Sequence, residues 1–186
     1  KDLTVIGIDG EEFVYSKDNN SNMKVEYKVG DNWTTDVQQV TNVEDSKDIE
    51  IRVTVPNYDP LEGKITATVT KRNVTLTSGD GSKAYDGIAL KNETVTVGGD
   101  GFVKDEGATY SDFASITNQG KTSNEFEYKL NKGTLAGNYN IEKKYGTLVI
   151  TNSETKLTFA EGSPQGYNGM YDGDAHDALK LSLIHI

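Results

Sequence analysis

The chain has 186 residues and a formal net charge of −10; 34% of its residues are hydrophobic, 26% are charged, and none is cysteine. The negative charge disfavours nucleic acid and anionic membranes as partners. The lack of cysteine excludes disulfides, thiolate metal sites and cysteine catalysis. No apolar run reaches the roughly 18 residues of a membrane-spanning helix, so we expect no membrane insertion.

Strand patterns fill the first part of the chain. Apolar residues alternate with charged ones over residues 23–29 and 48–55, and with threonine over residues 65–70. This period of two is typical of half-buried strands, and Pro56 ends the second of them. Trp33, the only tryptophan, follows a Gly-Asp-Asn turn, and we expect it to fold back as a plug in the core.

The same kind of pattern begins again twice. Val74 and Leu76 open a second set of alternating segments after Lys71-Arg72, and Leu157 and Phe159 open a third after Asn152-Ser153. We therefore expect a first domain over residues 1–72, a second over 73–152, and the truncated start of a third over 153–180. The last residues, 181–186, resemble a translated sequencing adapter and are excluded from the fold; the alternative is a strand of the third domain.

Two short landmarks recur in the same order, which indicates a tandem array. One is Tyr85-Asp86-Gly87, which returns as Tyr171-Asp172-Gly173; the other is Asn57-Tyr58, which returns as Asn138-Tyr139. In the first landmark we expect Tyr to seal a small core and Asp to accept hydrogen bonds from its own turn. Gly is expected to supply the positive φ.

The ordered segments are rich in Thr, Val, Ile and Tyr, and no window has a helical apolar period. Short strands between Gly, Asn and Asp turns favour an all-β chain of tandem small β-sandwich, Ig-like domains. The alternative is a β-grasp-like domain, which would need a short helix within residues 105–116.

A resemblance to known repeats supports this organisation. Residues 73–152 resemble the YDG-type repeat of large surface proteins of Gram-positive bacteria, in Lys83-Ala84-Tyr85-Asp86-Gly87, Gly99-Asp100-Gly101-Phe102-Val103, Glu106-Gly107-Ala108-Thr109-Tyr110, Asn124-Glu125-Phe126, Asn138-Tyr139-Asn140-Ile141 and Gly146-Thr147-Leu148. Residues 1–72 are similar to the related MBG-like or Ig-like repeat, in Val25-Glu26-Tyr27, Trp33-Thr34, Pro56-Asn57-Tyr58 and Val69-Thr70-Lys71-Arg72. The third unit departs from the pattern, because residues 166–170 lengthen the approach to Tyr171. The resemblance implies export, and repetition along a stalk or adhesin.

No residue set predicts an enzyme, a cofactor or a strong metal site. The acidic clusters at residues 172–177 and 80–106 lack the spaced oxygen ligands of a calcium loop, so solvated turns are the favoured interpretation, with a weak calcium site between domains as the alternative. A lysine–asparagine isopeptide at Lys64 or Lys83 is disfavoured because both lysines lie near turns. Tyr110 and Tyr145 have no clear inward position, so they are the candidates for ligand contact.

We therefore expect the domains to be structural spacers of an extracellular, cell-wall-attached or secreted protein that presents a distal domain. Their expected partners are neighbouring repeats of the same chain. Two alternatives stay open: an adhesin module that binds host glycan or protein, and accessory domains of a secreted glycosidase.

Overall fold

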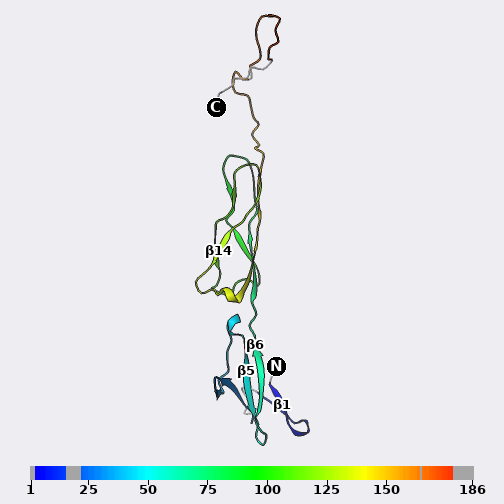
Figure 1. Ribbon diagram of the computed structural model, residues 1–186, viewed down its shortest axis with the longest axis vertical. Helices are drawn as coiled ribbons and strands as arrows, with labels where there is room; N and C mark the ends of the chain where they lie inside the picture. The colour runs from blue at the N-terminus through cyan, green and yellow to red at the C-terminus, as the bar shows by residue number, and fades with distance from the viewer. Residues whose placement is uncertain (1–2, 16–21, 164, 178–186) are drawn as a thin grey trace.

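A computed structural model describes residues 3–15, 22–163 and 165–177 of the chain (Figure 1). The fold is all-β, which confirms the predicted class. Within those ranges the helical segments are three short 3₁₀ turns: η1 (Ile8–Gly10), η2 (Val43–Asp45) and η3 (Ala136–Asn138). Two strand-rich units and a tail follow one another along the long axis of the molecule (Figure 1). We refer to residues 3–67 as the N-terminal unit, 72–151 as the central unit and 152–177 as the tail.

The N-terminal unit is built on a four-stranded antiparallel sheet in the order β4-β3-β5-β6. Its strands are β3 (Lys24–Val29), β4 (Asn32–Thr34), β5 (Lys47–Thr54) and β6 (Leu61–Ala67), and a separate hairpin pairs β1 (Thr4–Ile6) with β2 (Glu12–Val14). The buried residues Met23, Val25, Val53 and Val55 form its core, against which Phe13 and other hairpin residues pack. The period-two pattern thus places one face of the sheet against the hairpin.

Trp33 lies on the other face of this sheet, so the expectation of a core plug is wrong. In the β3–β4 register Trp33 pairs with Lys28, and opposite residues in a ladder share a face. The Arg52 guanidinium carbon lies 4.5 Å from the centroid of the Trp33 ring. The ring therefore covers charged side chains on the polar face.

The central unit contains two three-stranded sheets and two short strand pairs. One sheet has the order β10-β7-β15 and the other β13-β16-β8; β15 runs parallel to β7, and β16 runs parallel to β8. The bounds are β7 (Arg72–Ser78), β8 (Gly81–Ala84), β9 (Leu90–Lys91), β10 (Val95–Gly99), β11 (Ala108–Ser111), β12 (Ser115–Ile116), β13 (Gly120–Ser123), β14 (Glu127–Leu130), β15 (Tyr139–Lys144) and β16 (Thr147–Thr151). Residues 105–116 thus contain strands β11 and β12 where the β-grasp alternative needed a helix.

The core of the central unit combines apolar packing with a buried polar network. Val74, Leu76, Phe126 and Tyr139 form one buried cluster, and burying an aliphatic or aromatic side chain contributes about 1.5–3 kcal/mol. Beside this cluster lies Asn124, which is fully buried. Its side-chain nitrogen donates to the carbonyl oxygens of Gly79 and Asn92 at 2.8 and 2.9 Å. These bonds join three segments that do not belong to one sheet.

The described tail residues form turns, bends and irregular backbone, with a single bridge residue at Gly166. Leu157 and Phe159 are 102% and 80% exposed, whereas Val74 and Leu76, which open the central unit with the same spacing, are 1% and 0% exposed. The tail therefore carries a strand-like apolar pattern without a core. Residues 178–180 of the expected third domain and the suspected adapter residues 181–186 lie outside the described residues.

Candidate functional site

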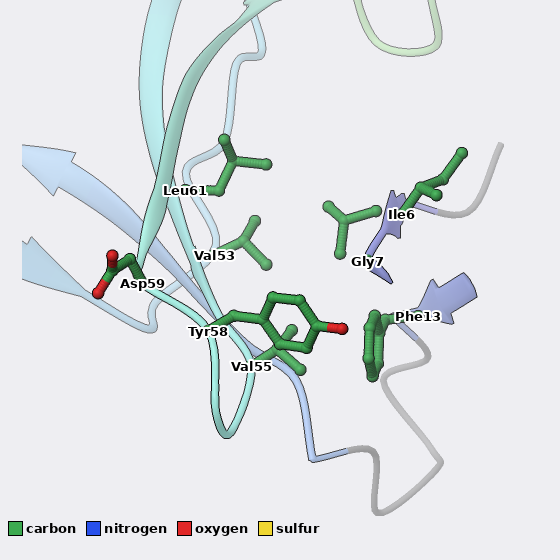
Figure 2. Close-up of a pocket in the computed structure, with 9 residues that line it drawn as sticks. Ile6, Gly7, Phe13, Val53, Val55, Tyr58, Asp59 and Leu61 are labelled. Atoms are coloured by element: carbon green, nitrogen blue, oxygen red, sulfur yellow. The ribbon is translucent and has the colours of Figure 1, made fainter. Parts of the chain in front are cut away.

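An apolar hollow of about 210 Å³ lies between the β1–β2 hairpin and the sheet of the N-terminal unit. Figure 2 shows Ile6 and Phe13 on the hairpin side and Val53, Val55 and Leu61 on the sheet side. Pockets for small molecules usually measure about 300–1,000 Å³ and contain convergent polar groups. This hollow is smaller than that range and mostly aliphatic, so it suits one apolar side chain better than a sugar.

The main polar group at the hollow is the Tyr58 hydroxyl, and its hydrogen bonds are used within the unit. It accepts from the Ile8 amide at 3.1 Å and donates to the Glu11 carboxylate at 3.1 Å. Gly7 permits this approach, because a Cβ at Gly7 would lie 2.8 Å from Cζ of Tyr58. Tyr58 therefore fastens the hairpin to the sheet, and the carboxylate of Asp59, which also borders the hollow, points away from it (Figure 2).

The central unit repeats this arrangement around Tyr139. Its hydroxyl accepts from the Val103 amide at 3.2 Å and donates to the Glu106 carboxylate at 2.7 Å. In both units the residue whose amide binds the tyrosine lies three residues before the glutamate. The glutamate amide donates to the carbonyl oxygen of that residue at 3.1 Å and so closes the turn. Each tyrosine also meets a phenylalanine edge-on, Phe13 for Tyr58 and Phe102 for Tyr139. We call this arrangement the tyrosine tie.

The Tyr85-Asp86-Gly87 and Tyr171-Asp172-Gly173 segments form closely similar turns. Asp86 accepts from the Ile88 amide at 2.9 Å, and Asp172 accepts from the Asp174 amide at 3.0 Å. Gly87 and Gly173 have φ values of 80° and 85°, which favour glycine. The bonds from the Lys83 ammonium and the Ile88 amide hold the pKa of Asp86 below its ordinary value. These bonds stabilise the turn itself, and in the second copy the Asp172 carboxylate also bonds Nε2 of His176 at 2.9 Å.

The tyrosines of the two turns differ in their surroundings. The Tyr85 amide donates to the Thr151 carbonyl at 3.0 Å, which attaches the first turn to the end of β16. Tyr85 is 41% exposed and Tyr171 is 93% exposed. The turn geometry is thus present in both copies, but both tyrosines are exposed, so the expectation that this tyrosine seals a small core is wrong.

Tyr110 and Tyr145, the candidates for ligand contact, lie around Phe126. Their ring centroids are 5.9 and 5.8 Å from that of Phe126, and both contacts are edge-on. Burial raises the pKa of the Tyr110 hydroxyl, while Tyr145 is 41% exposed. Such packing stabilises a core, whereas sugar binding needs an open ring face beside polar groups.

The acidic clusters do not converge on a metal site. Among the residues that the structure describes, no group of three or more His, Asp or Glu side chains is placed to hold a metal ion. Lys64 and Lys83, considered above for an isopeptide, form ion pairs with Asp48 and Asp86. The described helical segments are also too short and too polar to cross a membrane.

The remaining site is the joint between the two units, where Asn138 reaches across. Its Nδ2 donates to Oδ1 of Asn42 at 2.8 Å, and its Oδ1 accepts from the Val43 amide at 2.9 Å. The Asp45 carboxylate accepts from the amides of Asn42 and Thr41 at 2.7 and 3.1 Å. These two bonds lower the pKa of Asp45, and they fix the turn that receives Asn138.

Sequence reasoning identified Asn138 but not its partners. Thr41-Asn42-Val43-Glu44-Asp45 has an asparagine three residues before an acidic residue, the spacing that begins a helical turn with reciprocal hydrogen bonds. That signal predicts the turn. It does not predict which residue of the next unit the turn receives. Asn57, the other copy in the landmark, lies instead with φ 70° between β5 and β6.

No protein-family model, curated protein or solved structure matches the chain. The function is therefore inferred from the residues and contacts described above.

Proposed function

We propose that the chain is a semi-rigid spacer in which successive β units hold a distal part of a bacterial surface protein away from the cell. The observation that carries the proposal is the joint at Asn138. One side-chain amide of the central unit makes two hydrogen bonds with the N-terminal unit. A net contribution of about 0.5–1.5 kcal/mol for each bond is enough to favour one orientation of the two units over many.

The segment between the units is anchored at both of its ends. Residues 68–71 separate β6 from β7, and such short connections limit the motion of the elements that they join. The Val69 amide donates to Oγ of Ser46 at 2.9 Å in the N-terminal unit. The Arg72 guanidinium donates to the Gly101 carbonyl at 3.0 Å and also to that of Asp100 in the central unit. Both attachments favour a joint with little bending.

The proposed location at the cell surface rests on the resemblance to YDG-type and MBG-like repeats. The charge of −10 suits an exposed protein that must stay soluble at high local concentration. The adhesin alternative needs aromatic rings with open faces. The edge-on packing of Tyr110 and Tyr145 against Phe126 favours a structural role for both rings.

The test is the distribution of distances between the two units. Because the chain has no cysteine, Glu62→Cys and Lys129→Cys place one spin label on each unit at exposed positions. Pulsed electron paramagnetic resonance is expected to give one narrow distance distribution. Asn138→Ala is expected to broaden it about twofold, since the two bonds of about 0.5–1.5 kcal/mol each are lost.

Asn140→Ala is the matched control, because Asn140 lies two residues away and binds Asn73 within its own unit at 3.1 Å. It should leave the distribution unchanged. A distribution that is already broad in the parent chain, or that Asn138→Ala does not alter, would reject the spacer proposal.

A further inference from the structure

The far end of the central unit shares one antiparallel strand pairing with the end of the N-terminal unit that receives Asn138. In the N-terminal unit the last strand, β6, pairs antiparallel with β5, and in the central unit the last strand, β16, pairs antiparallel with β13. Thr-Asn stands shortly before the partner strand in each unit, as Thr41-Asn42 before β5 and as Thr117-Asn118 before β13. The two Thr-Asn segments therefore lie at corresponding ends of their units.

This far end is open where the corresponding end of the N-terminal unit is covered. Asn42 and Val43 are half-buried at the joint, whereas Thr117, Asn118 and Gln119 are exposed. A shallow hollow of about 440 Å³ lies between residues 119–121 and 149–152. The surface thus offers an exposed amide side chain next to a space at the end of the last strand.

The turn at the far end is held in a different way. Lys121 stands three residues after Asn118, where Asp45 follows Asn42 in the N-terminal unit. Lys121 already belongs to β13 and pairs with Val149 of β16. Backbone pairing therefore begins at Gly120, shortly after this segment, whereas a carboxylate restrains the Thr-Asn segment of the N-terminal unit.

We propose that the far end, defined as residues 117–121 with Thr151 and Asn152, is a docking surface for another unit built like the central one. The occupant would present an end like η3, with its asparagine bound to Asn118 as Asn138 is bound to Asn42. The existing joint shows how an end like η3 binds an asparagine side chain of the neighbouring unit. The inference rests on the proposed spacer function. It adds a second contact between units, at Asn118, to the one at Asn42.

The tail supplies a second observation in favour of this occupant. Leu157 and Phe159 repeat the spacing of Val74 and Leu76 a few residues after β16, yet both are exposed. A segment with the apolar pattern of a first strand thus begins beside the far end. In the sequence it follows the last strand of the central unit at about the same interval as β7 follows β6.

The experiment extends the chain with the proposed occupant. A copy of residues 72–151 is fused directly after Glu154, so that its first strand begins where the Leu157 pattern begins. Lys129→Cys in the central unit and in the copy allows one pair of spin labels to report on the new joint. A narrow distance distribution is expected, and Asn118→Ala should broaden it about twofold.

The copy of Asn138 should give the same broadening when it is changed to alanine, and the copy of Asn140 serves as the control. A distribution as broad as that of a free linker, or one that Asn118→Ala does not alter, would overturn the inference. A copy that fails to fold would also count against it, since docking should stabilise the copy. The spacer proposal is tested separately at the first joint, where Glu62→Cys and Lys129→Cys can give a narrow distribution even when the second joint is flexible.

Discussion

The Tyr139 hydroxyl donates a 2.7 Å hydrogen bond to the Glu106 carboxylate, and Tyr58 makes the corresponding bond to Glu11 at 3.1 Å. Because each hydroxyl also accepts a backbone amide from the same turn, one side chain fixes a loop to the core of its unit. The tyrosine tie is therefore a feature that the two units share although their strands are connected differently.

Removing the hydroxyl of Tyr139 is expected to destabilise the central unit. Tyr139→Phe keeps the ring against Phe102 but leaves the Val103 amide and the Glu106 carboxylate without their partner. The expected loss is about 1–2 kcal/mol of the free energy of unfolding, measured by urea denaturation. Tyr128→Phe is the control, and an equal loss in that variant would contradict the specific role of the tie.

Asn124 should be among the most sensitive polar positions of the central unit. Asn124→Ala removes two hydrogen bonds from a fully buried side chain and leaves the half-buried carbonyls of Gly79 and Asn92 without this donor. A loss of about 2–4 kcal/mol is expected, because buried groups without partners carry their full desolvation cost. Asn140→Ala, at an exposed position, should cost less than about 0.5 kcal/mol. Similar unfolding midpoints for the two variants would show that the buried network contributes little.

Acid should weaken the N-terminal unit through Glu26. Hydrogen bonds from Lys24 and then from Arg52 hold the pKa of Glu26 below the ordinary glutamate value of 4.5. Folding lowers this pKa, so the stabilisation is complete above pH 4.5 and is lost as the pH falls through the folded value. Melting curves followed by Trp33 fluorescence should shift to lower temperature below that pH. Glu26→Gln should flatten the dependence, and an unchanged slope in that variant would assign the effect to other carboxylates.

The turn at Gly87 should not accept a side chain. Gly87→Ala places a Cβ on a residue with φ 80°, which costs an L-residue about 1–2 kcal/mol. Gly98→Ala is the matched control within the same unit, because its added Cβ would meet its neighbours at 3.8 Å or more and its φ is not positive. Differential scanning calorimetry should show a lower melting temperature for the first variant only. Equal melting temperatures would mean that the turn tolerates other backbone conformations.

The sequence by itself determined the features that depend on near neighbours. Alternation of apolar and polar residues predicts the strands of residues 24–29 and 47–54, since side chains on a strand point to opposite faces in turn. The Asp86 turn is equally local, because its carboxylate binds an amide two residues later. The recurrence of these signals is what favoured an all-β tandem chain.

Only the tertiary structure decided which distant segments meet. The face that carries Trp33 depends on the register of β4 against β3, and a shift of one residue would reverse it. The strands in residues 105–116 exist because β11 pairs with β14 and β12 pairs with β9. Asn138 and Asn42 are 96 residues apart in the chain, and no local periodicity encodes such a contact. Their meeting depends on two folded units and the short anchored segment between them, which together place one asparagine opposite the other.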